Sequence, residues 1–131
     1  MLKDKVRKAP GGTGALSCFF CGSCTAGCPV NKIDEAFDPR KIMRMLSLDR
    51  KDVLSSAELW KCSQCHVCVA HCPQDVRFAD VLRVLRDLAV TEGIVPASLL
   101  DDVEKVNAEF QKKRLEKIKE LSQKTIKDGE A

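Results

Sequence analysis

Large aromatic side chains are scarce in this sequence of 131 residues, which has no Tyr, one Trp and five Phe. A chain of this length is expected to form one ordinary domain, with room for an appended arm or helix. So few aromatics leave the centre of that domain short of the side chains that usually fill it. We therefore expect something other than large side chains to occupy part of the interior.

Strong charge and long apolar runs are absent as well. The formal net charge is only +3, and no stripe of Lys and Arg is interleaved with aromatics, so nucleic-acid binding is not favoured. The basic start, MLKDKVRKAPGG, is not followed by the apolar region of a signal peptide. No apolar run approaches the about 18 residues that a membrane span needs. We expect a protein of the cytoplasm, or of a cytoplasmic face.

The usual patterns of catalytic residues are also missing. The sequence shows no Ser/His/Asp arrangement, no glycine-rich turn between a strand and a helix for a nucleotide, and no evident pair of carboxylates. We therefore predict no independent active site and no catalytic residues. The chain is expected to serve a partner.

Cysteine is what the sequence does have. All eight lie in two runs, CFFCGSCTAGCP (Cys18 to Pro29, the first run) and CSQCHVCVAHCP (Cys62 to Pro73, the second run). Eight cysteines without a secretory signal argue for metal in a reducing compartment rather than for disulfides. A zinc site usually joins two C-x-x-C pairs, whereas each run here has the C-x2-C-x2-C-x3-C-P spacing of [4Fe–4S] proteins. Paired zinc sites and a disulfide framework are the lesser alternatives.

The spacing also predicts which cysteines share a cluster. In two-cluster ferredoxins, the fourth cysteine of each such run binds the cluster of the other run. By that rule one [4Fe–4S] cluster takes Cys18, Cys21, Cys24 and Cys72, and the other takes Cys62, Cys65, Cys68 and Cys28. Two clusters would fill the interior that the aromatics leave short, and would couple folding to the cofactor.

The residues between the cysteines differ in the two runs. Two glycines and two phenylalanines of the first run are replaced by histidines and polar residues in the second. Because cluster potentials respond to charge, sulfur hydrogen bonds and exposure, we expect two unequal potentials. His66 and His71 are expected beside a cluster or at the surface rather than as ligands, and Trp60 as packing rather than an electron relay.

The remaining sequence predicts helices and no strands, so we expect an all-α fold. In DPRKIMRMLSL, Asp38 is a plausible N-cap and Pro39 a first helical residue. In SSAELW, Ser55 and Glu58 suggest a capping box. The apolar pattern of RFADVLRVLRDLAVTEG ends at Gly93, where a C-terminal glycine cap belongs.

Three segments are expected along the chain. Residues 1–15 are basic and then glycine-rich, which indicates a loosely held N-terminal arm or, alternatively, a docking arm. Residues 16–95 hold both cysteine runs and form the cluster-binding domain. Residues 96–131 are expected to form one long helix, whose thin apolar stripe either packs on its own domain or docks on a partner.

Three stretches together resemble the iron–sulfur C subunit of heterodisulfide reductases: SCFFCGSCTAGCPV, DPRKIMRML and LWKCSQCHVCVAHCP. The resemblance covers roughly Leu16 to Gly93. Similar cysteine runs occur in the iron–sulfur subunits of fumarate reductase, succinate dehydrogenase, glycolate oxidase and glycerol-3-phosphate dehydrogenase. Those proteins add a [2Fe–2S] domain or cysteine-rich CCG domains, which are not seen in this sequence, and this favours the stand-alone C subunit.

The resemblance implies an α-helical ferredoxin fold within a larger soluble complex. In that family, the flavin-containing A subunit passes electrons to the C subunit, which passes them to the B subunit, whose CCG-bound clusters reduce the CoM–CoB heterodisulfide. The eight cysteines correspond one by one to the ligand positions assigned above. The alternatives are a freely diffusing dicluster ferredoxin, an electron-transfer subunit of a related respiratory oxidoreductase, and an iron–sulfur sensor or structural module.

Overall fold

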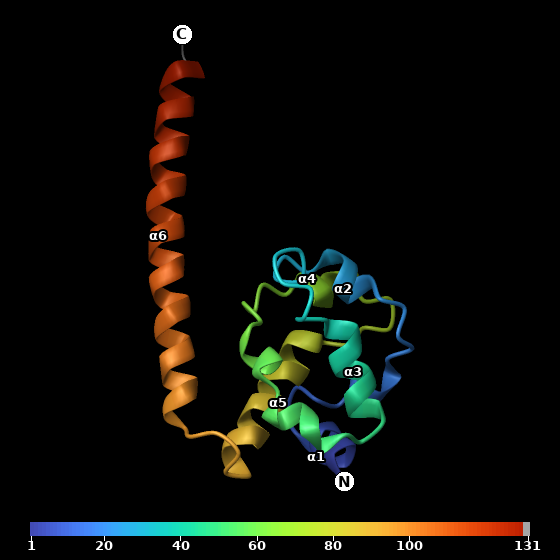
Figure 1. Ribbon diagram of the computed structural model, residues 1–131. Coiled ribbons are helices and arrows are strands. Elements are labelled where there is room, and N and C mark those ends of the chain that lie inside the picture. Colours follow the sequence, from blue (N-terminus) through green and yellow to red (C-terminus); the bar gives the residue numbers. More distant parts are fainter. Residues whose placement is uncertain (130–131) are drawn as a thin grey trace. The chain divides into compact units, whose positions relative to one another are not determined.

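The computed structural model describes residues 1–129 and contains helices but no strand within that range (Figure 1). The expected all-α class is therefore confirmed for the described residues. The chain divides into two compact units, Met1–Pro96 and a second that begins at Ala97. The elements are α1 (Leu2–Lys8), the 3₁₀ helix η1 (Ala15–Ser17), α2 (Ser23–Gly27), α3 (Pro39–Ser47), the 3₁₀ helices η2 (Lys51–Ser55) and η3 (Ala57–Trp60), α4 (Val67–His71), α5 (Phe78–Thr91) and α6 (Ser98–Gly129).

Helix α5 forms the centre of the Met1–Pro96 unit. Its apolar residues recur at helical spacing, as the sequence predicts, and eight of its 14 residues are buried. It contacts α1, α4, η2 and η3. The ring of Phe78, at its start, lies 6.4 Å from the ring of Phe37 between centroids. Burying a Leu, Val or Phe side chain contributes about 1.5–3 kcal/mol, so α5 supplies much of the unit's stability.

Helix α3 begins as the sequence predicts. Pro39 is its first residue, and the Asp38 carboxylate accepts a hydrogen bond from the Lys41 N–H at 3.2 Å. The same carboxylate oxygen accepts a hydrogen bond from the Thr25 hydroxyl of α2 at 2.7 Å. The N-cap of α3 therefore also ties this helix to the element that carries the third cysteine of the first run.

The predicted capping box at Ser55 was wrong. The Ser56 hydroxyl is the acceptor, from the Glu58 N–H at 3.2 Å, and it opens the 3₁₀ helix η3. Ser55 ends the preceding helix η2 and donates its hydroxyl proton to the Asp52 carbonyl at 3.1 Å. Because Ser56 is the extended residue between two short helices, it stands only two residues before Glu58, whereas a capping box needs a separation of three.

Helix α5 ends at a glycine cap, as predicted. Gly93 has a φ of +73°, and its N–H donates to the Val90 carbonyl at 3.0 Å. The Ile94 N–H donates to the Ala89 carbonyl at 2.9 Å. These two bonds form a Schellman motif, which requires a residue that tolerates the left-handed region.

The N-terminus differs from the loosely held arm that the sequence suggested. Residues 2–8 form α1, and its Leu2 and Val6 are 1% and 0% exposed. These residues are four apart and therefore share one helical face, which packs into the core beside α3 and α5. Immediately after α1 the chain turns back so closely that a Cβ on Gly12 would lie 1.9 Å from the Val6 carbonyl oxygen. Two apolar residues among so many charges were too weak a signal to predict this helix.

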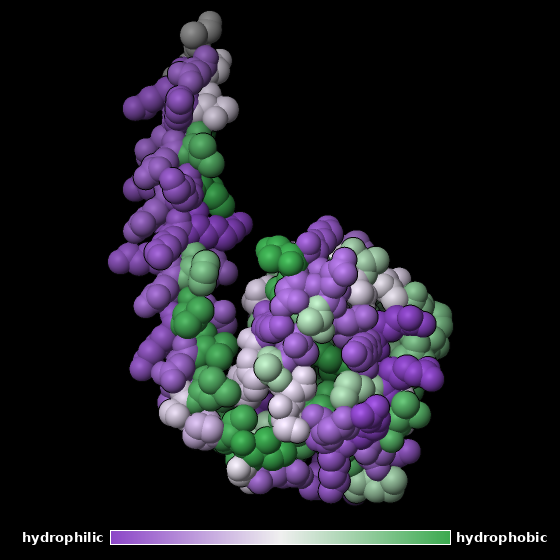
Figure 2. Space-filling model, in the orientation of Figure 1, coloured by the Kyte–Doolittle hydropathy of each residue, from purple (hydrophilic) through white to green (hydrophobic). Residues whose placement is uncertain are grey.

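The second unit contains the long helix that the sequence predicts, α6, with 32 residues. None of its residues is buried. Figure 2 shows that its surface is mainly hydrophilic, with a narrow apolar stripe along its length. The apolar side chains of this helix include Val106, Phe110, Leu115, Ile118 and Leu121. No helix within residues 1–129 is long and apolar enough to cross a membrane.

Candidate iron–sulfur centres

Two hollows in the Met1–Pro96 unit are each lined by cysteines of both runs. The first hollow is lined by Cys18, Cys21 and Cys24 together with Cys72 of the second run. The second hollow is lined by Cys62, Cys65 and Cys68 together with Cys28 of the first run. Cys68 also reaches the wall of the first hollow. Each hollow therefore has on its wall the four thiols that the spacing assigns to one cluster, and the first hollow has Cys68 as a fifth.

The crossing of the fourth cysteines follows from a repeated local structure. Helices α2 and α4 have five residues each and pack against each other. The fourth cysteine of each run is the C-cap residue directly after its helix, and Cys28 and Cys72 have the same backbone angles, φ −73° and ψ 119°. Because the two helices are neighbours and equivalent, each delivers its last cysteine to the hollow of the other run.

The loop before each helix has the same unusual backbone. Phe20 and Gln64, two residues after the first cysteine of each run, have φ values of 62° and 57°. Residues other than glycine adopt this left-handed region at a cost of about 1–2 kcal/mol. The conformation turns the N–H of Phe20 toward the Cys18 sulfur and the N–H of Gln64 toward the Cys62 sulfur, both at 3.4 Å. The loops therefore offer hydrogen bonds to sulfur, as a cluster site requires.

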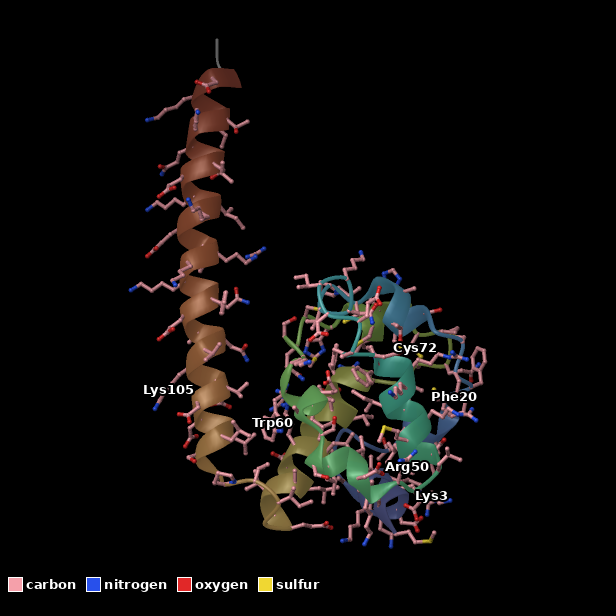
Figure 3. All side chains as sticks on the ribbon, viewed as in Figure 1. Lys3, Phe20, Arg50, Trp60, Cys72 and Lys105 are labelled. Carbon is pink, nitrogen blue, oxygen red and sulfur yellow. The ribbon has the colours of Figure 1, made fainter. Side chains whose placement is uncertain are left out.

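The fourth cysteines receive similar hydrogen bonds. The Cys28 sulfur accepts one from the Asn31 N–H at 3.5 Å, and the Cys72 sulfur accepts one from the Val76 N–H at 3.3 Å. Figure 3 shows Cys72 and Phe20 on the same side of the unit, where both line the first hollow. Backbone donors directed at sulfur favour a thiolate over a thiol.

Burial favours the neutral form of four of the thiols. Burial raises the pKa of Cys18, Cys24 and Cys62 above the ordinary value, and raises the pKa of Cys68 to about 11. The exposed Cys21 is the exception, because a hydrogen bond with the Ser23 hydroxyl lowers its pKa. A thiol that ligates a metal is deprotonated, so binding of iron in these hollows must release protons.

Two arginines accompany the hollows, and the sequence reasoning missed both. Arg40 lines the first hollow from an exposed position and donates its Nε hydrogen to the Phe20 carbonyl at 2.7 Å. Arg86 is buried and donates to the carbonyls of Leu59 and Cys62, at 2.7 and 3.1 Å. The sequence did contain a signal for Arg86: it lies four residues after the buried Leu82 on α5, at a position where the helical pattern predicts an apolar side chain.

The histidines and Trp60 lie near the sites. His66 lines the second hollow and precedes α4, whereas His71 is exposed at the end of that helix. Trp60 is partly buried and stacks on the Arg86 guanidinium at 5.4 Å, beside α5 (Figure 3). The position of Trp60 agrees with the prediction that it serves in packing.

No group of three or more His, Cys, Asp or Glu side chains in residues 1–129 is placed to hold a single metal ion. A tetrahedral zinc ion holds its four thiolates about 3.8 Å apart, given a Zn–S distance of about 2.3 Å. In an iron–sulfur cube each thiolate binds a different iron, so the four sulfurs surround a hollow instead. All eight cysteines are free of disulfides. The spacing of the donor set and the hydrogen bonds to sulfur fit [4Fe–4S] clusters.

Comparison with known proteins agrees with this chemistry. Residues 17–77 match the 4Fe-4S dicluster domain. The chain is 38% identical over 77 residues to the C2 subunit of the H2/formate:CoB-CoM heterodisulfide,ferredoxin reductase of Methanococcus maripaludis, a match that covers 59% of this chain and 41% of the relative. It is 40% identical over 91 residues to the C subunit of the Ferredoxin:CoB-CoM heterodisulfide reductase of Methanosarcina mazei, covering 70% and 55%.

A third relative is the iron–sulfur C 2 subunit of the CoB–CoM heterodisulfide reductase of Methanocaldococcus jannaschii, 36% identical over 77 residues, with 59% and 41% covered. The chain spans about half the length of the curated relatives it matches. The chain is thus a homologue of the iron–sulfur C subunits of heterodisulfide reductases, and its residues 17–77 match the 4Fe-4S dicluster domain.

Proposed function

We propose that the Met1–Pro96 unit binds two [4Fe–4S] clusters with crossed ligation. The first hollow would hold a cluster on Cys18, Cys21, Cys24 and Cys72, and the second a cluster on Cys62, Cys65, Cys68 and Cys28. The observation that carries this proposal is the lining of each hollow by four such thiols from both runs. When bound, the clusters supply sites that accept and release single electrons.

The chain's own residues would hold the two sites in a fixed relation. Packing of α2 on α4 keeps the hollows side by side. The N–H groups of Phe20 and Gln64 donate to ligand sulfurs and so stabilise negative charge there. The free thiols suit a reducing compartment, and on that ground we place the protein in the cytoplasm.

The proposed role is that of an electron-transfer subunit in a complex of the heterodisulfide reductase type. The chain would relay electrons between an A subunit, which carries flavin and iron–sulfur clusters, and a catalytic B subunit with CCG domains, and would itself transform no substrate. Support comes from the homologues, which are named as C subunits of such reductases. The eight cysteines are accounted for by the clusters, which leaves no thiol for other chemistry.

A free dicluster ferredoxin is the second candidate, together with an electron-transfer subunit of a related respiratory oxidoreductase. The second unit argues against a mere carrier, because a helix of 32 residues with an exposed apolar stripe is typical of an interaction surface, which a mere carrier does not need.

Anaerobic purification of the tagged full chain from its native host tests the proposed role. We expect a flavoprotein and a CCG-domain protein in the eluate, identified by mass spectrometry. Recovery of the chain alone, as a brown monomer that exchanges electrons with several redox proteins, would instead support the free ferredoxin.

A further inference from the structure

Arg86 is the one charged residue that is buried among residues 1–129, with 5% of its surface exposed. It extends from α5 under the loop that enters the second run. Its Nε donates to the Leu59 carbonyl at 2.7 Å, its Nη2 donates to the Cys62 carbonyl at 3.1 Å, and its guanidinium stacks on the Trp60 ring. Planar arginine is suited to this combination of two fixed donors and a stacking face.

No carboxylate pairs with Arg86 in the described part of the chain, because none of the ion pairs there includes it. A buried charge without a partner is costly, so such residues are normally paired or bind metal sites. The guanidinium of Arg86 instead holds the backbone carbonyl of Cys62, a residue whose sulfur would become a thiolate on ligating iron. With the cluster assignment proposed above, the second-run cluster would supply the counter-charge that this buried cation lacks.

The Cys62 sulfur also has a second donor that its counterpart lacks. It accepts hydrogen bonds from the Gln64 N–H and from Gln64 Nε2, at 3.4 and 3.6 Å. The Cys18 sulfur accepts one from the Phe20 N–H, and phenylalanine has no polar side chain to add another. The backbone in the two loops is the same, so the difference lies in the side chains alone.

The first hollow is lined by a cation too, Arg40, but its charge is exposed to solvent and therefore has a weaker electrostatic effect. Arg40 is exposed and donates to the Phe20 carbonyl rather than to that of a cysteine. Water and salt screen an exposed charge, whereas a buried charge acts through a medium of low dielectric constant.

Building on the cluster assignment proposed above, we propose that Arg86 is a positioning residue that raises the reduction potential of the second-run cluster above that of the first-run cluster. Reduction adds negative charge, so a buried cation and an added hydrogen bond to sulfur favour the reduced state. Electrons that enter the chain would therefore reside preferentially at the second run.

The test is an anaerobic potentiometric titration of the full chain, followed by EPR. The wild type is expected to show two midpoints. Arg86→Gln keeps hydrogen-bond donors but loses the charge, and should lower the upper midpoint by at least about 59 mV, which is a tenfold change for one electron, while the lower midpoint stays. Arg86→Lys keeps the charge and should retain most of the wild-type value. Arg83→Gln removes a positive charge from an exposed position on the same helix and should move neither midpoint.

The variants separate a charge effect from a structural one. Equal shifts in Arg86→Gln and Arg86→Lys, or a shift of the lower midpoint, would overturn the proposal. Arg40→Gln is expected to lower the other midpoint, by a smaller amount, and so identifies the first-run cluster. A wild type without two reversible reductions would refute the cluster assignment itself.

Gln64→Leu tests the hydrogen-bond part of the proposal independently of Arg86, and Arg86→Lys remains the test of the charge if Arg86→Gln does not fold. It removes the Nε2 donor and also a buried Oε1 that accepts no hydrogen bond in the described residues. Phe20, which is not branched at Cβ, occupies the equivalent left-handed position, so leucine fits that backbone. The upper midpoint should fall in this variant. An unchanged upper midpoint would show that the hydrogen bond from Gln64 to the Cys62 sulfur does not raise the potential.

Discussion

At the scale of single residues, the fourth cysteine of each run has the most informative position. Cys28 ends α2 yet lines the second hollow, and Cys72 ends α4 yet lines the first. Each of these thiols therefore lies in one run of the sequence but lines the hollow of the other run. Replacing it tests which of the two clusters it would ligate.

We predict that Cys28→Ser impairs the second-run cluster and spares the first-run cluster. Anaerobic EPR should then lose the same signal as in Cys65→Ser, since both cysteines line the second hollow. The reciprocal variant Cys72→Ser should instead match Cys21→Ser, because these two line the first hollow. If Cys28→Ser instead lost the EPR signal that Cys21→Ser loses, crossed ligation would be refuted.

Asp38 is a residue whose cap also links two helices. Asp38→Ala removes the acceptor for the Lys41 N–H and for the Thr25 hydroxyl. Loss of an N-cap costs about 0.5–2 kcal/mol, and the second lost bond adds about 1 kcal/mol. We expect a lower midpoint in anaerobic urea unfolding, with Asp38→Asn much closer to the wild type because its amide oxygen still accepts. Equal losses in the two variants would mean that the carboxylate charge, not the cap, matters.

At the scale of elements, the pairs of equivalent parts explain how a small chain builds two similar sites. The helices α2 and α4 repeat one another, and so do the loops before them. What differs is support from outside the repeat: α3 and Arg40 adjoin the first loop, while α5 and Arg86 adjoin the second. Two sites with one backbone can therefore have different electrostatic surroundings.

The packing of α1 depends on the tight turn after it, and we predict that Gly12 and Gly14 in this turn differ in their tolerance of a side chain. Gly12→Ala should destabilise the protein by roughly 1–3 kcal/mol, because the new Cβ would lie 1.9 Å from the Val6 carbonyl oxygen. Gly14→Ala is the matched control, since its Cβ would meet only the Asp75 carbonyl oxygen at 3.8 Å. Thermal unfolding under anaerobic conditions compares them, and a tolerated Gly12→Ala would show that α1 is loosely held after all.

At the scale of the whole molecule, the clusters are expected to act as structural ties as well as redox groups. If each cluster takes ligands from both runs, its removal releases the loops on both sides at once. Burial also keeps Cys18, Cys24, Cys62 and Cys68 as neutral thiols when no iron is bound, through the raised pKa values described above.

We therefore predict that iron chelation unfolds the Met1–Pro96 unit in one cooperative step. Far-UV circular dichroism during anaerobic chelation should lose helical signal in parallel with the visible absorbance of the clusters. A chain that keeps its full helical signal after complete loss of iron would show that the apolar core around α5 suffices for folding.

The division into two units leads to a truncation prediction. A chain that ends at Pro96 keeps all eight cysteines and the core around α5. It should retain the EPR signals and iron content of the full chain. If α6 serves as a partner-docking element, the truncated chain should no longer bring down its partners in the co-purification. Loss of the clusters on truncation would instead assign α6 a structural role in the first unit.

The amino-acid sequence by itself determined the features that depend on neighbouring residues. The spacing of the cysteines predicted the sets of four thiols, and Asp38, Pro39 and Gly93 marked a helix start and a helix end correctly. Helix caps are local, so a short stretch contains all the groups that form them, whereas the sets of four thiols were predicted by the repeat of one spacing in two distant runs. The exception at Ser55 arose where two 3₁₀ helices adjoin and the boundary shifts by one residue.

Only the tertiary structure decided what depends on distant residues. The sequence alone did not show that Leu2 and Val6 are core residues, because their burial depends on α3 and α5. Nor did it show that Arg86 approaches the Cys62 carbonyl, a contact between residues 24 positions apart. A surface arginine and a buried one have the same letter in a sequence, and the packing around the side chain decides whether its charge is screened by water or held beside the second cysteine run.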